Sequence, residues 1–172
     1  CHIIPGLSAF VGGDITAGIL ASGMLEQEAS TLLIDLGTNG EMALGNRHRL
    51  HACATAAGPA FEGGANRGIW GADMVRLLQK LLEEGLMDGQ GLLKEPYFTK
   101  GVRIGDVLVT KESVRAVQLA KGAIAAGIEI LADSYGIRFS DISKVVLAGG
   151  FGYYLDPKAA VAIGLLPEEL AD

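Results

Sequence analysis

Several features that often identify a protein class are scarce in this chain of 172 residues. Only two cysteines are present, Cys1 and Cys53, and their separation matches neither a zinc site nor a redox motif. An iron–sulfur cluster usually takes four thiolates, so this chain cannot hold one by itself. No uninterrupted apolar run is long enough to span a bilayer, so we expect no membrane span.

Positive charge is also scarce, because 14 Lys and Arg residues face 20 Asp and Glu residues, for a net charge of −6. No basic cluster interrupts this acidic balance, so we expect no nucleic-acid partner. The first residue is Cys rather than Met, and no signal-peptide pattern follows it. We therefore interpret the chain as a fragment of a longer, cytoplasmic protein.

Common catalytic motifs are missing as well. The chain has no P-loop and no properly placed Gly-x-Gly-x-x-Gly, which excludes P-loop and Rossmann nucleotide sites. No nucleophile elbow for acyl transfer is present. His48 and His51 lie three residues apart on a predicted strand and point to opposite faces, so they make a poor metal pair. What the chain does have is a set of glycine-rich turns that follow apolar strands.

The most informative stretch is residues 31–41, in which a β-forming apolar run leads through Asp35 into a turn of small residues. Gly37 and Gly40 can adopt positive φ, so we expect a tight turn whose backbone N–H groups face an anion. Asp35, at the end of the strand, would then hold a hydrated magnesium ion rather than the phosphate itself. The alternative is an acidic hairpin without a ligand.

Three β runs follow one another closely, at residues 31–36, 41–44 and 49–54, and turn signals separate them. This pattern predicts an antiparallel meander. It ends in a loop, residues 57–64, that is too rich in glycine to be only a connector. There, backbone N–H groups would meet a nucleotide, and Glu62 would accept a hydrogen bond from a ribose hydroxyl or orient a metal-bound water.

Helical patterns are predicted from Ile15 to Gly23, from Gly71 to Gly85 and from Lys111 to Tyr135. Asp14 precedes the first helix and is the one position there that can do chemistry. The leucines of the second helix are assigned to the core. Lys121, midway along the third, is either solvated or borders a ligand cleft and donates to the nucleotide. A short β stretch at residues 102–110 separates the last two helices.

A second glycine motif follows a predicted buried strand at residues 144–148. It reads Gly149-Gly150-Phe151-Gly152, and such a turn places bare backbone at the carboxyl edge of a sheet, where ligands bind in open α/β folds. Without Cβ atoms, Gly149 and Gly150 permit an adenine and a ribose to lie flat against the chain. Asp156, followed by proline, predicts the start of another helix.

This order of parts resembles a ribonuclease-H-like lobe of the superfamily that contains sugar kinases, heat-shock chaperones and actin. Residues 35–40 are similar to the second phosphate motif of these ATPases, and residues 147–152 to their adenosine motif. The resemblance implies an α/β fold with three antiparallel strands followed by parallel strands, and with helices on both faces. Residues 1–30 would be the end of the first lobe and a connecting helix, and residues 31–172 the second ATPase lobe.

Four motifs in order narrow the resemblance to the carboxy-terminal domain of reductive activators of corrinoid proteins. They are residues 34–41, 56–63, 118–124 and 148–157. In that family, ATP hydrolysis drives an electron from a [2Fe–2S] cluster in a ferredoxin-like amino-terminal domain to a corrinoid, which returns to Co(I). The resemblance therefore implies ATP and Mg²⁺ as cofactors and an iron–sulfur domain upstream. It also implies a corrinoid protein or corrinoid-dependent methyltransferase as partner, and it leaves a homodimer open.

The resemblance also implies the roles of the site residues. Asp35 would orient magnesium, through water, or the attacking water, and Glu62 would assist it in catalysis. Thr38 and Asn39 would contact the β and γ phosphates. Further nucleotide contacts would come from the glycines and their neighbours, namely Gly37, Gly40, Gly58, Gly63, Lys121, Gly149, Gly150, Phe151 and Gly152.

Two departures from the family pattern bear on activity. The first phosphate motif of the family would precede Cys1, so the chain holds at most the end of the first lobe. The family also carries a longer segment between Gly64 and the Gly68-Ile69 pair. We expect the complete protein to be an ATPase and the fragment alone to be inactive. A small-molecule kinase of the same superfamily and a non-catalytic nucleotide-binding module are the alternatives.

Overall fold

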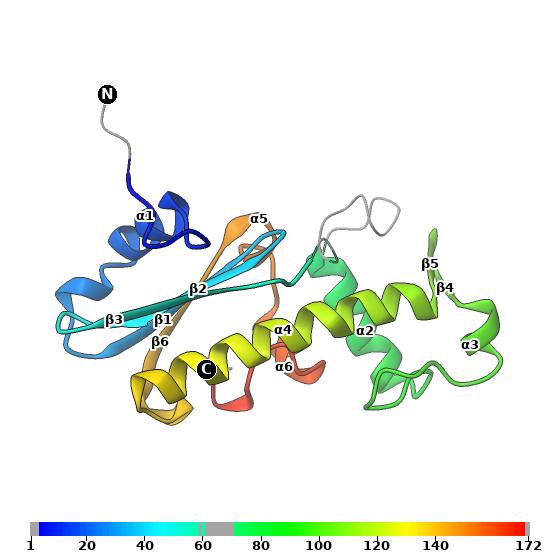
Figure 1. The fold of residues 1–172 in the computed structure, drawn as a ribbon. Coiled ribbons are helices and arrows are strands. Elements are labelled where there is room, and N and C mark those ends of the chain that lie inside the picture. Colours follow the sequence, from blue (N-terminus) through cyan, green and yellow to red (C-terminus); the bar gives the residue numbers. More distant parts are fainter. Residues whose placement is uncertain (1–3, 59, 61–70, 171–172) are drawn as a thin grey trace.

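A four-stranded mixed sheet occupies one half of the molecule in the computed structural model, which describes residues 4–58, 60 and 71–170. Strands β1 (Ser30–Leu36), β2 (Gly40–Gly45), β3 (Leu50–Thr55) and β6 (Ile142–Ala148) lie in the order β3-β2-β1-β6. β1, β2 and β3 pair antiparallel, and β6 runs parallel to β1 (Figure 1). The predicted meander and the α/β fold class are therefore confirmed.

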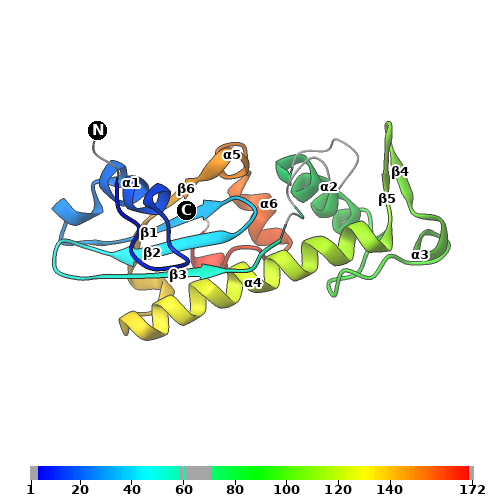
Figure 2. The same ribbon diagram turned by 45° about the horizontal axis from the view of Figure 1, so that its top comes forward.

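Helices cover both faces of this sheet, as expected. Helix α1 (Gly13–Ser22) packs Ile15 and Ile19 against Leu33 of β1 on one face. Helix α4 (Lys111–Tyr135) lies across the other face, and Figures 1 and 2 show it extending beyond the sheet to the far end of the molecule. A Cβ atom at Gly127 would lie only 2.6 Å from Cγ2 of Thr55, so glycine lets α4 approach the sheet closely.

The remaining helices are short or lie away from the sheet. They are α2 (Gly71–Glu83), α3 (Tyr97–Lys100), α5 (Gly149–Gly152) and α6 (Pro157–Ala162), with 3₁₀ turns η1 (Met24–Glu26), η3 (Phe139–Asp141) and η4 (Glu168–Leu170). Two helices begin with a side-chain cap, and the cap at Asp156 agrees with the predicted helix start. The Thr110 hydroxyl accepts from the Ser113 N–H before α4, and the Asp156 carboxylate caps α6. Within the described residues, no helix has the length and apolar character needed to cross a bilayer.

The structure confirms one further β prediction and corrects another. The predicted β stretch at 102–110 is confirmed as a hairpin of β4 (Val102–Ile104) and β5 (Val107–Val109), which turns at Gly105 and is separate from the main sheet. The strand at 144–148 is not buried, because β6 is an edge strand and none of its residues is fully covered. Among the described residues, β6 is also the one strand of the main sheet that runs parallel to its neighbour.

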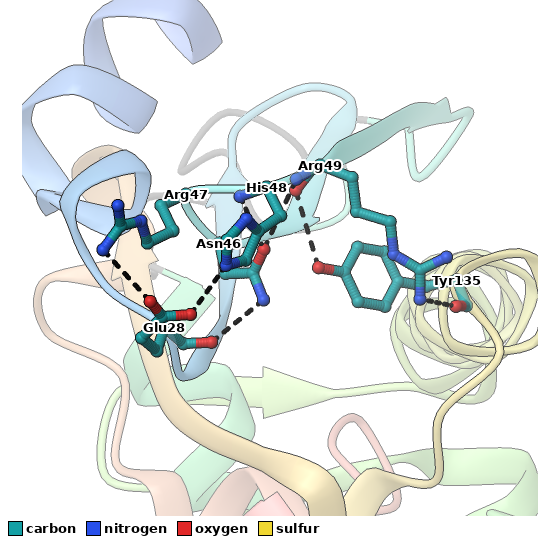
Figure 3. A network of polar contacts seen from close by, with 6 residues as sticks. All are labelled: Glu28, Asn46, Arg47, His48, Arg49 and Tyr135. Carbon is teal, nitrogen blue, oxygen red and sulfur yellow. Dashed lines mark hydrogen bonds and ion pairs between the residues drawn. The ribbon is translucent and has the colours of Figure 1, made fainter.

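A polar network ties the β2–β3 hairpin to its surroundings at the end of the sheet (Figure 3). The Glu28 carboxylate contacts Arg47 Nη1 at 3.0 Å and His48 Nε2 at 2.7 Å. The guanidinium carbon of Arg49 lies 3.8 Å from the centre of the Tyr135 ring, and Arg49 also donates to the Tyr135 carbonyl. These two contacts between Arg49 and Tyr135 hold the hairpin to the last turn of α4. His48 contributes to this network through its Nε2 contact with Glu28.

Candidate functional site

The two glycine motifs meet where β1 and β6 end. The strands run parallel and side by side, and Asp35 is in register with Ala148. Gly149 follows at a φ of 83°, and a Cβ atom there would lie 2.5 Å from Asp35 Oδ1 and 2.6 Å from the Leu36 carbonyl oxygen. Only glycine fits this position without strain. The fold thus brings a half-buried carboxylate and a bare stretch of backbone to the same edge of the sheet.

The turn after Asp35 is an exposed three-residue hairpin loop. Gly37, Thr38 and Asn39 are exposed, and the Gly37 N–H donates to the Asn39 carbonyl at 3.1 Å. The expected positive φ is wrong for both Gly37 and Gly40. Gly40 is extended in β2, and a Cβ atom there would lie 2.7 Å from Thr55 Oγ1. Glycine is therefore needed at this position for packing against β3, whereas the loop itself is exposed at the edge of the sheet.

Three carboxylates influence one another around this turn. Asp35 is paired in register with Glu41 on β2, and the Glu41 carboxylate accepts from the Gly12 N–H at 3.3 Å. Burial raises the pKa of Asp35, and the charge of Asp14 raises it further. Burial also raises the pKa of Glu41, as do the charges of Asp14 and Asp35, against the opposing effect of the Gly12 N–H. A cation bound here would relieve this repulsion.

The donor set suits a largely hydrated ion. Among the described residues, no three His, Cys, Asp or Glu side chains are spaced to enclose a metal. Mg²⁺ typically keeps several waters and takes one or two carboxylates together with substrate phosphates. Asp35 beside an exposed loop fits that requirement, and a caged site for Zn²⁺ or Ca²⁺ does not arise among these three carboxylates.

A cavity of about 410 Å³ opens beside the second glycine motif. Gly150, Phe151 and Tyr154 line one side, and the start of α2 lines the other, including Asp73 and Arg76. A Cβ atom at Gly150 would meet nothing within 4 Å, so this glycine leaves open space. The motif is a single helical turn, α5, rather than the irregular turn that the sequence predicts. The volume is ample for a flat heterocycle and a sugar.

The sequence does not predict that residues of α2 line this cavity. Its pattern assigns the leucines of α2 to the core, and Leu78 and Leu81 are indeed buried. The opposite face exposes Asp73 and Arg76, whose side chains approach to 3.8 Å. The amphipathic pattern of α2 indicates that this face is polar, but it does not predict which distant segment the face contacts. Here that segment is α5, more than 70 residues later in the chain.

The structure gives less information about the roles of the other predicted site residues. The Lys121 ammonium donates to the Ile163 carbonyl at 2.7 Å, and Lys121 lines a separate cavity of about 310 Å³ with Asp88 and Gln118. Gly58 has a φ of 74° with open space around its Cβ position, and Gly152 is buried against Leu147. Glu62 and Gly63 lie outside the described residues. The nucleotide contacts of all these residues stay predictions.

Comparison with known proteins identifies what the chain is similar to. Residues 29–68 and 64–172 match the model described as the C-terminal domain of RACo, the ASKHA domain, which is an actin-like ATPase fold. The chain is 35% identical to "Corrinoid activation enzyme RamQ" of Eubacterium limosum, over 96% of this chain and 37% of that protein. It is 26% identical to "[Co(II) methylated amine-specific corrinoid protein] reductase" of Methanosarcina barkeri, over 97% of this chain and 41% of that protein.

A solved structure agrees with these sequence matches. The "Reductive activator for corrinoid, iron-sulfur protein" superposes with a TM-score of 0.85 at 31% identity, over 95% of this chain and 34% of that one. This chain thus spans between about a third and two fifths of its relatives' lengths. The alignment with the Eubacterium protein covers 222 positions against 172 residues here, and the family match divides at residues 64–68. Both facts agree with a segment that is shorter than in the relatives near Gly64. The chain belongs to the family of C-terminal ASKHA domains of RACo.

Proposed function

We propose that this chain is the nucleotide-binding domain of an ATP-dependent reductive activator. In the complete protein, ATP hydrolysis would drive electrons from a [2Fe–2S] cluster in another domain onto a corrinoid protein and return its cobalt to Co(I). The observation that carries the proposal is the meeting of Asp35 with Gly149 at the shared end of β1 and β6. In this proposal the Asp35 carboxylate would orient the metal ion beside the backbone that would hold the nucleoside.

Residues on the two sides of the junction between Asp35 and Gly149 would have different roles in binding ATP. Thr38 and Asn39, which are exposed on the hairpin loop, would donate to phosphate oxygens. Asp35 would hold the water shell of Mg²⁺, and ionisation of its carboxyl would be favoured by the ion despite the burial that raises its pKa. When bound, Mg²⁺ would neutralise charge on the β and γ phosphates. The cavity between Arg76 and Gly150 would receive the base.

The remaining predicted roles complete this proposal. Glu62 would orient the attacking water or bind the ribose, and Gly58 and Gly63 would offer backbone N–H groups to the nucleotide. Lys121 would act from the α4 side, where its ammonium already meets the end of α6. The fit of Asp35 to a hydrated ion and the polar loop beside it are what support ATP and Mg²⁺ as cofactors.

A small-molecule kinase of the same superfamily is the alternative enzyme. It would use the same nucleotide contacts, but its ATP turnover would require a small hydroxylated acceptor instead of a corrinoid protein. The names of the relatives favour a reductive activator over a kinase, because two of these names refer to a corrinoid protein as the object of the reaction. A non-catalytic module would bind ATP and hydrolyse none of it with any partner.

Substitution Asp35→Asn in the complete protein tests the proposal. We expect ATP hydrolysis measured with the corrinoid partner to fall at least about hundredfold, because the metal-bound phosphates lose their orienting charge. Formation of Co(I), followed by visible absorption, should stop in parallel. Asp133→Asn is the matched control, since it makes the same chemical change on the exposed surface of α4. Unchanged turnover in Asp35→Asn would overturn the assignment, and turnover that needs only a small acceptor would favour the kinase.

A further inference from the structure

Helix α3 and the first turns of α4 lie at the end of the molecule away from the sheet (Figures 1 and 2), and residues of both line a surface groove. Its volume is about 590 Å³. Three of its lining side chains are apolar and strongly exposed: Leu92 at 54%, Phe98 at 36% and Leu119 at 59%. Apolar side chains that gather on an exposed surface commonly mark an interaction site. We call this feature, lined also by Lys111, Glu112 and Arg115, the α4 groove.

The charge around the α4 groove is opposite to that of the chain. Residues 91–119 carry five Lys and Arg against three Asp and Glu, whereas the whole chain carries 14 against 20. Lys111 lies 4.9 Å above the Phe98 ring and 4.0 Å from the Glu112 carboxylate. Arg115 makes no ion pair with any residue that the structure describes. A guanidinium beside exposed apolar side chains suits a partner that offers a carboxylate next to an apolar residue.

We propose that the α4 groove docks the corrinoid protein through an acidic surface segment bearing an apolar side chain. The inference rests on the proposed function for the identity of the partner. Charge complementarity selects such a segment, because the apolar floor takes a side chain while Lys111 and Arg115 attract its acidic flanks. The groove is small for a permanent interface and suits a brief encounter. A brief encounter is what an activator needs, since it must release each partner after reduction.

The position of the groove relative to the nucleotide cavity agrees with this role. Helix α2 begins at the nucleotide cavity with Gly71 and Asp73, and its later residues Leu78 and Leu82 line the cavity that contains Lys121. That cavity shares Gln118 with the α4 groove. The docking surface is therefore separated from the nucleotide by packed helices, and groove substitutions leave the residues around Asp35 and Gly149 untouched.

Two substitutions in the complete protein test the groove. Arg115→Glu reverses the unpaired charge, and Leu119→Ser removes an exposed apolar side chain. We expect each to weaken binding of the corrinoid protein about tenfold in isothermal titration, and the pair of changes to weaken it further. ATP hydrolysis without partner should be unchanged. Binding to the wild type should weaken as salt rises, and Arg115→Glu should reduce that dependence, because part of the attraction is between charges.

Matched controls exist outside the groove. Ile130→Ser changes a side chain of α4 that is 62% exposed, close to the 59% of Leu119, but lies outside the groove. Lys158→Glu reverses an exposed charge on α6. Both controls should bind the partner as the wild type does. Binding that is equally strong in the groove variants, or a loss that is shared by the controls, would overturn the proposal.

The result is separable from the proposed function. Asp35→Asn should bind the corrinoid protein and fail to reduce it, whereas Arg115→Glu should keep its own ATP hydrolysis and lose the partner. If the groove variants change only self-association in sedimentation velocity and leave partner binding intact, the groove pairs two copies of this protein and the docking proposal is wrong. A wild type that binds no corrinoid protein would refute the proposed function first.

Discussion

Replacing Gly149 by alanine should damage both the fold and the site, and the structure allows the size of the effect to be worked out. The residue has a φ of 83°, and a non-glycine residue in this region costs about 1–2 kcal/mol. The new methyl group would also overlap Asp35 Oδ1 and the Leu36 carbonyl oxygen, at 2.5 and 2.6 Å. Forcing atoms into a filled position typically adds about 1–3 kcal/mol. The free energy of unfolding should therefore fall by about 2–5 kcal/mol.

Gly150→Ala is the matched comparison, one residue further along. Its Cβ atom would meet nothing within 4 Å and its φ is not positive, so the free energy of unfolding should change by less than about 0.5 kcal/mol. The same methyl group would stand in the cavity between α5 and α2. If the nucleoside lies against this backbone, Gly150→Ala should weaken ATP binding about tenfold while leaving the fold intact.

Two measurements on the complete protein separate these effects. Hydrogen exchange of the amides of β1 and β6 reports the stability of the strand pair, and isothermal titration reports the affinity for ATP with Mg²⁺. A midpoint about 6–12 °C lower in thermal unfolding of this domain corresponds to a loss of about 3 kcal/mol in Gly149→Ala. Wild-type stability in Gly149→Ala would refute the packing argument, and wild-type affinity in Gly150→Ala would refute the placement of the nucleoside.

The remaining predictions concern charge and the polar network. Because burial and Asp14 raise the pKa of Asp35 above its unfolded value, ionisation at neutral pH disfavours the nucleotide-free fold. Asp35→Asn should then unfold at a higher temperature than the wild type at pH 7. This difference in unfolding temperature should vanish below pH 3.8, the ordinary pKa of an aspartate, where Asp35 is protonated in both the folded and the unfolded protein. A difference that is the same at pH 7 and at pH 3 would contradict the reasoning. Arg49→Ala removes the stacking on Tyr135 and a hydrogen bond, so it should cost about 1–2 kcal/mol. Faster hydrogen exchange in the β2–β3 hairpin should accompany this loss, and unaltered exchange would show that the contact contributes nothing.

Local signals in the sequence predict much of the fold. The bounds of α4, from Lys111 to Tyr135, agree with prediction because its start and end depend on neighbours in the chain: a threonine cap at Thr110 and a left-handed glycine at Gly136. The first three strands follow from turn signals in the same way. Asp156 and the proline after it predict the start of α6 for the same local reason.

Long-range packing accounts for what the sequence does not predict. The room that a Cβ atom would need at Gly40 is filled by Thr55 across the strand pair and by Ile124 of α4, neither of which is near in sequence. The cavity beside the second glycine motif depends on the meeting of α2 with α5, so the sequence around the exposed Arg76 does not indicate that this residue lines it. By contrast, the nearness of Asp35 to Gly149 follows from a rule that relates parallel strands to a common edge. The site is thus predictable where its parts end neighbouring strands and unpredictable where a distant helix completes it.

Gly122 gives α4 a mechanical property that packing alone does not explain. Nothing lies within 4 Å of its Cβ position, so no close approach requires a glycine there. Glycine within a helix weakens it by about 1 kcal/mol relative to alanine, so this is the place where α4 resists bending least. The sheet holds the helix at Gly127, and the groove residues lie on the other side of Gly122. Over the 11 residues from Gly122 to Lys111, about 16.5 Å of helix, a bend of about 5° would move Lys111 by about 1.4 Å. A small bend at Gly122 is thereby amplified into a displacement at the start of the helix, beside the groove.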